Sequence, residues 1–475
     1  MKTYSLSLLT LFSLFILYSC NEEDTEDFSL STCINVDKEI IDVGEIVKIS
    51  NCSTNYTSFE FQYFDDRQNE QVTSTDSILE LSFSTPGNYT ISLMISDQNG
   101  NSETETVSIT VNDVTDKLFL IDTPQDFSSM PLAAGLDEIT GDIYYIDSFG
   151  LLTGRMAYRY RVLDAEFNEV SNTFLRERTE NGGSAFRLSF PNDKKIIYMV
   201  NTFSTSYFSR QITISQSNNI AVDFTGISVV NGSLNLNDNR LFFGSESEYI
   251  NEEQRFKNYP AIEIRDNAND IVERKIFTDL NFQNSIISDL IVVDDGFVAF
   301  GAAFENDGNS LLNYTPLLIF FDPNLEITEI KEFTSSQLNS SDTFISYDNL
   351  NRFMHIEKLS SGNLVTYGLG EIRVMNSKGE ELFSRIVTNL SGGTLLKLND
   401  SFVISRRGYL AKYDETGNLI KEIFTNGVVT TNLNLKDDRI IFVSAFESKD
   451  SDNITVFRPF IGEVDTDLNF IDLNN

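Results

Sequence analysis

The sequence predicts an all-β protein in which a small N-terminal β-sandwich is followed by a β-propeller. Short segments of alternating apolar and polar residues run through the chain, separated by Asn, Asp and Gly. This alternation is the pattern of antiparallel strands joined by turns. Between residues 121 and 471 a unit of four such segments recurs, which is typical of propeller blades. The strands expected before residue 113 are more closely spaced and predict a sandwich.

The clearest copy of the repeated unit lies between Thr394 and Phe424. Its polar breaks are an Asn399-Asp400 turn, a loop at Arg406–Gly408 and an Asp414-Glu415-Thr416-Gly417 turn. Turn formers at these places divide the unit into two hairpins. We therefore expect four strands, at Leu395–Leu398, Phe402–Ser405, Tyr409–Tyr413 and Asn418–Phe424.

The second hairpin of this unit recurs with polar corners at Asp164, Gln216, Asp266, Asp322, Asn376 and Asp414. A looser copy spans Ile454–Ile471, and the corners are roughly fifty residues apart, as four-stranded blades require. We expect seven blades, with six or eight left open. Lys117–Ile121 is an extra strand that would close the ring by pairing with the last blade. The segments Asp294–Gly301 and Asp414–Asn418 resemble the blade motif of propellers in bacterial surface proteins.

Composition narrows the classes of partner. The chain has 475 residues, with 35 Lys and Arg against 71 Asp and Glu, and a net charge of −36. A surface this acidic repels phosphate backbones and anionic lipid headgroups, so nucleic acid is excluded as a partner. Such a surface is compatible with calcium or with a basic partner, and also with a simple role in solubility.

His355 is the only histidine, and the chain has no tryptophan. Metal sites built from several histidines are therefore excluded, and a Ser-His-Asp triad would have to use His355. Because His355 lies in the strand-like run Phe353–Ile356, we expect a satisfied core or edge residue.

The first thirty residues predict the compartment. Met1-Lys2 is followed by the apolar run Leu8–Leu17, which is too short for a membrane span, and then by Leu17-Tyr18-Ser19-Cys20. This motif resembles a bacterial lipobox, and the acidic residues after it resemble the surface-export tag of Bacteroidota-type lipoproteins. The resemblance implies a signal peptide at residues 1–19, a lipid on Cys20 and an acidic linker at 20–29. The membrane would be contacted only through this lipid, on an outer-membrane protein exposed at the cell surface. An ordinary secretory signal is the alternative.

Cys33 and Cys52 are the other two cysteines. In an oxidising compartment such a pair favours a disulfide, with two separate buried thiols as the alternative.

Residues 30–113 are expected to form the sandwich. The segments Thr85–Leu93 and Asp97–Asn101 resemble the polycystic-kidney-disease (PKD) family of immunoglobulin-like sandwiches. The family's Trp-Asp-Phe-Gly-Asp-Gly motif is reduced here to Phe61–Asp66. The resemblance implies a spacer, or a module that contacts protein or glycan. We expect Tyr89 to bond backbone at a corner, and Asp97–Gly100 to be a hairpin turn rather than a calcium loop.

A binding site is expected on the propeller, residues 114–475. The connections Asn201–Ser209, Ser245–Pro260, Ala302–Pro316, Thr334–Asp348 and Ser444–Asn453 are expected to be long loops on one face, where binding groups gather. Aromatic rings beside arginines suit sugar stacking or protein anchoring. The candidate binding residues are Tyr207, Phe208, Arg210, Tyr249, Arg255, Phe256, Tyr259, Phe304, Tyr314, Arg406 and Arg407. The alternative is that each of these side chains packs against a neighbouring blade and binds no ligand. Glu447–Asp452 offers oxygen ligands for calcium, or simply solvated loop charge.

These observations favour a non-catalytic surface lipoprotein whose propeller binds a glycan or a protein, with no cofactor unless calcium. A structural subunit of a surface assembly is the first alternative. A carboxylate-driven glycan hydrolase or lyase is the second, and it lacks a recognisable motif with a spaced pair of acids.

Overall fold

The computed structural model covers the whole chain, and its description is limited to well-placed residues. Backbone is described at residues 29–473, except 66–69, 84, 122–127, 138–139, 151–155, 178–183, 190–194, 204–205, 215–219, 225–226, 251–254, 269, 307–310, 335–353, 369, 388–392, 428 and 450–454. Side chains are additionally left out at 116, 156, 176–226, 255–256, 306, 311–313, 429–432 and 448–449. The lipobox with Cys20 lies outside the described residues.

The chain divides into two compact units, Met1–Asp113 and Val114–Asn475. The sequence places the same boundary between residues 113 and 114. Within the described part of either unit, no helix has the length and apolar character needed to cross a membrane. The one helical turn described is η1 (Thr115–Lys117).

The first unit is a sandwich of two sheets. A three-stranded sheet has the order β1-β3-β6, and a five-stranded sheet has the order β2-β8-β7-β4-β5. The strands are β1 (Ile34–Val36), β2 (Ile40–Asp42), β3 (Val47–Asn51), β4 (Ser58–Asp65), β5 (Glu70–Ser74), β6 (Ile78–Leu81), β7 (Gly87–Ser96) and β8 (Ser102–Asn112). Alternation along these strands turns Ile49, Phe61 and Leu93 inward, where each is fully buried. The sequence did not predict β1 and β5, since both are short edge strands.

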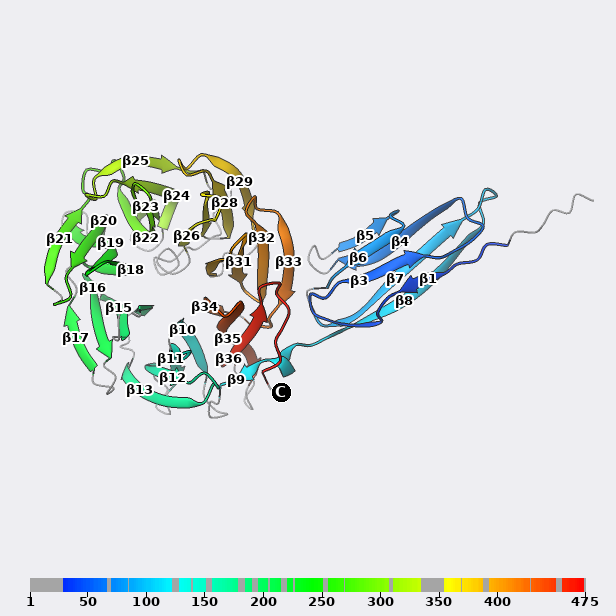
Figure 1. Ribbon diagram of the computed structural model, residues 1–475, viewed down its shortest axis with the longest axis horizontal. Coiled ribbons are helices and arrows are strands. Elements are labelled where there is room, and N and C mark those ends of the chain that lie inside the picture. The colour runs from blue at the N-terminus through cyan, green and yellow to red at the C-terminus, as the bar shows by residue number, and fades with distance from the viewer. Residues whose placement is uncertain are drawn as a thin grey trace, which may run out of the picture. The chain divides into compact units, whose positions relative to one another are not determined.

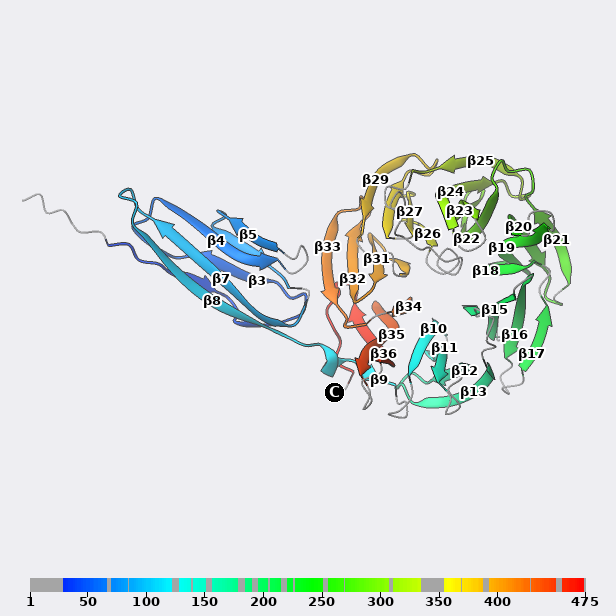
Figure 2. The same ribbon diagram turned by 180° about the vertical axis from the view of Figure 1, so that it is seen from behind.

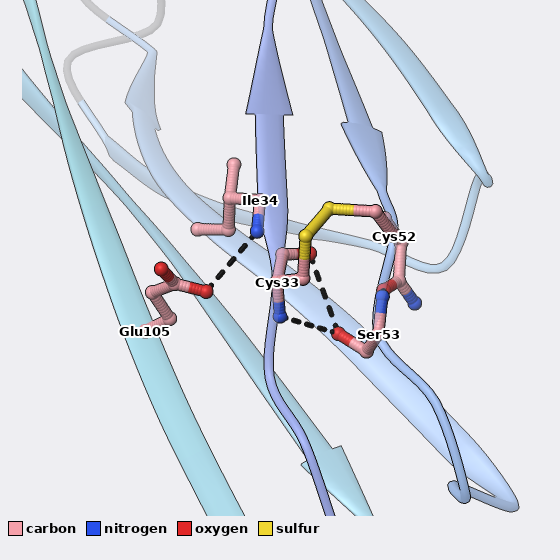
Figure 3. Close-up of a disulfide and its surroundings, with 6 residues drawn as sticks. Cys33, Ile34, Cys52, Ser53 and Glu105 are labelled. Atoms are coloured by element: carbon pink, nitrogen blue, oxygen red, sulfur yellow. Dashed lines mark hydrogen bonds between the residues drawn. A yellow bond between two sulfur atoms is a disulfide. The ribbon is translucent and has the colours of Figure 1, made fainter.

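Cys33 and Cys52 form a disulfide, as expected, with their Cα atoms 4.9 Å apart. Cys33 lies just before β1 and Cys52 just after β3, so the bond joins the ends of two paired strands (Figure 3). Around it Cys52 N–H donates to the Cys33 carbonyl at 3.0 Å, and Ser53 Oγ accepts from Cys33 N–H at 2.9 Å. The disulfide therefore helps to fix β1, because this strand has three residues and forms few backbone hydrogen bonds with β3.

Tyr89 and the Asp97 turn behave as the sequence predicts. The Tyr89 hydroxyl donates to the Thr85 carbonyl at 2.9 Å. Asp97 accepts from the N–H groups of Asn99 and Asn101 at 2.8 and 2.9 Å, which makes a hairpin turn.

The described residues of the second unit form seven four-stranded antiparallel sheets arranged in a ring (Figures 1 and 2). In six sheets the strands follow in chain order. The first strand of each sheet lies toward the centre of the ring, and the fourth lies on the outside. This is the architecture of a β-propeller. The strands are β10 (Ser129–Leu136), β11 (Ile143–Gly150), β12 (Met156–Leu163), β13 (Glu169–Glu177), β14 (Ser184–Ser189), β15 (Lys195–Phe203), β16 (Ser206–Ile214), β17 (Ile220–Phe224), β18 (Val229–Leu236), β19 (Asn239–Ile250), β20 (Arg255–Arg265), β21 (Ile271–Ile276), β22 (Asn284–Val293), β23 (Gly296–Asn306), β24 (Leu311–Phe321), β25 (Ile327–Glu332), β26 (Met354–Lys358), β27 (Leu364–Gly368), β28 (Glu371–Met375), β29 (Glu381–Ile386), β30 (Leu395–Lys397), β31 (Ser401–Arg406), β32 (Tyr409–Asp414), β33 (Leu419–Phe424), β34 (Val429–Lys436), β35 (Arg439–Lys449) and β36 (Thr455–Asp465).

The seventh sheet has the order β34-β35-β36-β9 and closes the ring. Its fourth strand is β9 (Phe119–Leu120), which pairs with Phe460 and Ile461 of β36. The expected closing strand is therefore confirmed. The expected strand near Ile471 is wrong, because beyond Asp465 a single bridge joins Val464 to Phe470. The place that this strand would take is filled by β9 from the start of the unit.

Neighbouring sheets pack face to face through apolar layers. Phe300 and Leu318 of the β22–β25 sheet share one buried cluster with Met354 and Ile356 of the next sheet. Buried ion pairs interrupt these layers. Asp147, fully buried, accepts a forked pair of bonds from Arg159 at 2.8 and 2.7 Å, and buried Glu263 accepts from Arg265 at 2.6 Å. Because removal of one partner leaves a charge buried, these pairs act as structural supports.

The turns between third and fourth strands share one design. Asp164, Asp266, Asp322, Asn376 and Asp414 each accept two backbone N–H bonds, from the second and fourth residues that follow. Short polar side chains that bond their own turn in this way favour it intrinsically. The fourth turn position has positive φ and is Gly379, Gly417 or a tucked apolar residue such as Leu325.

Candidate functional site

The two faces of the ring differ in the connections they carry. Because successive strands of a sheet run in opposite directions, the first-to-second and third-to-fourth turns lie on one face, here called the turn face. The second-to-third connections and the links between sheets lie on the other, here called the hairpin face. Most of the predicted binding residues belong to the hairpin face.

The hairpin face is built from strands where the sequence predicted long loops. The expected loop Ser245–Pro260 is mostly paired, because β19 and β20 continue together up to Ile250 and Arg255. The expected loops Ala302–Pro316 and Ser444–Asn453 are likewise shortened, since β23 pairs with β24 up to Asn306 and β35 with β36 up to Lys449. The loop prediction was wrong because a hairpin that projects from the ring carries polar side chains on both sides. Its composition is therefore the same as that of a loop.

Two neighbouring sheets lack this extension. β27 and β28 have five residues each, β31 and β32 have six, and each pair is joined by two residues. β19 has 12 residues, so at about 3.3 Å per residue its hairpin extends well beyond theirs. The sequence indicates a short loop at Arg406–Gly408, which would leave the hairpin face low at this one sheet. The structure extends this low rim to the sheet before.

Among the predicted binding residues, Tyr249 and Tyr259 lie on the long β19–β20 hairpin and are half-buried. The Lys257 ammonium lies 4.9 Å from the centroid of the Tyr259 ring. Tyr207 and Arg210 belong to β16 and Arg255 to β20, but their side chains lie outside the described residues, as do those of Phe208 and Phe256.

Tyr314 and Phe304 were wrongly predicted to face a ligand. Both are buried in the layer between two sheets, and the Tyr314 hydroxyl donates to Met354 Sδ at 3.3 Å. Burial raises the pKa of Tyr314 far above its usual value. Both residues cover a neighbouring sheet, because the hairpin that carries them is a paired strand rather than a loop.

Arg406 and Arg407 are engaged within the protein. Arg406 donates to buried Glu422 at 2.7 Å and stacks over the Tyr409 ring at 4.4 Å. Arg407 is half-exposed and pairs with Glu447 of β35 at 3.3 Å. Arg406 therefore supports its own sheet, and Arg407 ties the low rim to the neighbouring long hairpin. Neither is held ready for a ligand.

Only part of the predicted calcium segment Glu447–Asp452 lies among the described residues. Glu447 is paired with Arg407, and residues 450–452 lie outside the described part of the chain. Within the described part, no three His, Cys, Asp or Glu side chains are grouped so that they could hold a metal ion.

A polar cluster does form at the inner edge of the ring, where three first strands lie side by side. It consists of Asp289 of β22, His355 and Glu357 of β26, and Lys397 of β30. Asp289 Oδ2 accepts the Ile356 N–H at 3.0 Å, and it lies 3.7 Å from His355 Nδ1. Since β26 pairs only with β27, this carboxylate sits on the inner, unpaired edge of β26. We call these four residues the inner-edge cluster.

The electrostatics of the cluster centre on Glu357. Burial and, to a smaller extent, the Asp289 carboxylate raise the pKa of Glu357, and Lys397 lowers it, so that the pKa is about 7. The His355 Nε2 atom is buried and has no hydrogen-bond partner among the described residues. His355 is thus an edge residue, as expected, but it is not a satisfied one.

The position of His355 links the cluster to the low part of the hairpin face. His355 pairs with Tyr367, one residue before the end of β27, so it lies close to the short β27–β28 connection. Sequence reasoning missed this constellation, because Asp289 and Lys397 approach β26 from sheets distant in the chain. The only sequence signal was His355-Ile356-Glu357, two titratable residues on one side of a strand.

No family model matches the chain, and a search of curated proteins found no match. The chain is similar to solved structures at low identity. One is the WD40 domain of Neurospora crassa Pan2 (8% identity, TM-score 0.41, 75% of this chain and 100% of that one). Another is a calcium-binding regucalcin from Agrobacterium tumefaciens (12%, 0.31, 73% and 92%). A third is a protein of unknown function from Bacteroides caccae (11%, 0.35, 55% and 88%). These TM-scores are too low to support any conclusion, so the fold assignment rests on the strand pairing.

Proposed function

We propose that the protein is a non-catalytic surface lipoprotein whose propeller binds a partner, a protein or a glycan, on its hairpin face. The uneven height of that face carries the proposal. Projecting hairpins of paired strands stand on the same face as two low sheets, while the turn face repeats one compact turn. Rigid scaffolds that vary on one face present their binding groups there.

The rest of the chain fits the same role. The seven four-stranded sheets are proposed to be the seven blades of the propeller, and the first unit to be a PKD-like spacer. The lipobox supports a lipid on Cys20, which would place the sandwich between the membrane and the propeller. Replacement Cys20→Ser should abolish incorporation of a labelled fatty acid and release the protein from the membrane fraction. Retained labelling would contradict the anchor.

A glycan hydrolase or lyase is the second candidate, and one observation favours it. Glu357, with a pKa of about 7, is suited to proton transfer, and Asp289 supplies a second carboxylate beside it. The test is to measure glycan turnover by the unchanged chain and by Glu357→Gln and Asp289→Asn. Turnover by the unchanged chain that both variants lack would favour the hydrolase or lyase over the binding proposal.

The binding proposal is tested with the chain from residue 21 onward, which removes no described residue. Glycan arrays and cross-linked capture from the native cell surface would compare this chain with a variant in which an Asn-Gly turn replaces residues 248–257. Because Ser247 and Asn258 are a register pair, a two-residue hairpin fits there. Lys378→Ala, exposed on the turn face, is the matched control. Ligands lost by the hairpin variant and kept by the control support the proposal. Equal capture by all three proteins would overturn it.

A further inference from the structure

The inner-edge cluster gathers four titratable side chains at the inner edge of the ring, and one atom of it, His355 Nε2, has no hydrogen-bond partner among the described residues. Asp147, by contrast, is fully buried and paired with Arg159. Here the side chains remain partly open, with Asp289 exposed by 27% and His355 by 15%. A partly open polar cluster at the meeting point of rigid elements is a binding-site hypothesis on physical grounds.

The cluster is held in place by backbone. Asp289 Oδ1 accepts the N–H of Leu290 at 2.9 Å, while its Oδ2 accepts that of Ile356 at 3.0 Å. The ladder between β22 and β23 is irregular at the residue before Asp289. Bulges of this kind re-aim a side chain, and this one directs Asp289 across to the next sheet. The position of this carboxylate is therefore fixed before any ligand arrives.

The charges of the cluster select a cation. Asp289 and Glu357 are carboxyl groups, and Lys397 is the basic group that faces Glu357 from the next first strand. Ionisation of Glu357 places a second negative charge close to Asp289 in a poorly solvated position, which is costly unless a positive group accompanies it. A net charge of −36 adds long-range attraction for cations and repels acidic ligands. Among the described residues no three His, Cys, Asp or Glu side chains are grouped for a metal ion, which favours an organic cation.

We propose that the inner-edge cluster binds an ammonium or guanidinium group, presented as a Lys or Arg side chain by a protein partner. Asp289 and Glu357 accept hydrogen bonds from this group, and the His355 ring lies beside Asp289. The proposal deepens the binding function above and rests on it, because it makes the partner a protein with basic residues that reaches the ring through the hairpin face.

Proton release follows from this arrangement. A bound cation stabilises ionised Glu357, so at about pH 6, where the carboxyl is mostly protonated, binding releases close to one proton. At about pH 8 the carboxylate is already formed and binding releases almost none. If the ligand binds only the ionised form, the apparent Kd is about tenfold lower at pH 8 than at pH 6.

The test is calorimetric titration of the chain from residue 21 onward. The probes are a short Gly-Lys repeat peptide, its Arg equivalent, a norleucine control, spermidine and Ca²⁺. Two buffers of different ionisation enthalpy count the protons at each pH. We expect the Lys or Arg peptide to bind with the tenfold pH effect and the norleucine peptide not to bind. Asp289→Asn should raise Kd at least tenfold, and Glu357→Gln should remove both the pH effect and the proton release.

Glu103→Gln removes one exposed acid of the sandwich and is the matched control, so it should behave as the unchanged chain does. Thermal melting checks that each variant is folded. No peptide binding, binding of Ca²⁺ alone, or an unchanged pH effect in Glu357→Gln would overturn the inference. Tighter binding of spermidine than of either peptide would overturn the protein partner. None of these results would overturn the proposed binding function by itself. That function is tested separately, by whether the variant with the trimmed β19–β20 hairpin loses partner capture.

Discussion

Asp414 and Glu357 belong to neighbouring sheets of the same ring, yet their surroundings act on them in opposite ways. Burial alone would raise the pKa of Asp414, but hydrogen bonds from Asn418 and Thr416 hold it at about 2. Glu357 receives no such bonds from the residues that the structure describes, and burial beside Asp289 raises its pKa to about 7. The turn face uses its carboxylates to stabilise the fold. The inner-edge cluster keeps a carboxyl whose ionisation costs stability, and groups retained at such a cost point to function.

The largest expected effect is a gain of stability on replacement of Glu357. The unfolded chain releases this proton near its ordinary pKa of 4.5 and the folded chain near 7, so Glu357 lowers stability as the pH rises through this window. Above the window the loss is constant, at roughly 3 kcal/mol. Glu357→Gln should therefore stabilise the propeller by about that amount at pH 8 and hardly at all at pH 4. Urea unfolding at both pH values measures this gain. Equal gains at pH 4 and pH 8 would contradict the raised pKa of Glu357.

A smaller effect separates two turns of the same design. Gly417 of the propeller and Gly100 of the sandwich have φ values of +91° and +84°. A Cβ atom at Gly417 would meet the Phe383 ring, whereas Gly100 has open space around it. Positive φ alone costs an alanine about 1 kcal/mol. Gly100→Ala should lose about that much and Gly417→Ala about 3 kcal/mol, since the ring must also shift. Similar losses in the two unfolding transitions would mean that the turn, and not its packing, sets the cost.

Removal of the Asp414 side chain comes next. It accepts bonds from the N–H groups of Thr416 and Asn418 at 2.9 Å each. Asp414→Ala should therefore cost about 1 kcal/mol at pH 7, comparable to the loss of a helix cap. Because the folded pKa lies below the ordinary value of 3.8, the contribution of the charge is present above about pH 4 and is lost as the pH falls toward 2. The difference between the variant and the unchanged chain should shrink over that range, and a constant difference would contradict the assignment.

The smallest effect is expected on the hairpin face. Tyr249 is half-buried on a projecting hairpin, away from the layers between sheets. Tyr249→Ala should change the free energy of unfolding by less than about 0.5 kcal/mol, as surface substitutions usually do. A loss of several kcal/mol, measured by the same urea titration, would show that the hairpin is part of the core.

The sequence predicted what local chemistry determines. The four strands between Leu395 and Phe424 appear where expected, because Asp414 and Gly417 specify their turn without help from the rest of the chain. The Tyr89 corner was predictable for the same reason, and the disulfide because Cys33 and Cys52 are an even pair in an expected oxidising compartment. The hairpins were misread as loops, because a run such as Ser245–Glu248 is polar throughout and carries no strand alternation.

Most of what depends on distant strands could not be predicted. The pairing of β9 with the last blade was predicted, but its replacement of the strand expected near Ile471 was not. The inner-edge cluster likewise forms only when β22, β26 and β30 become neighbours, so Asp289 and Lys397 carry no sign of it in sequence. Tyr314 illustrates the reverse error. Its aromatic character suggested a binding residue, and the packing of two sheets buried it.

The contrast between the two carboxylates is tested most directly by carbon-13 NMR titration of side-chain carboxyl groups in the chain from residue 21 onward. Glu357→Gln assigns the Glu357 signal, and the titration is run with and without the Lys peptide. We predict a midpoint near 7 without the peptide and a lower midpoint with it. A midpoint near 4.5, or one that the peptide leaves unchanged, would contradict the proposal that this cluster is a cation-binding site.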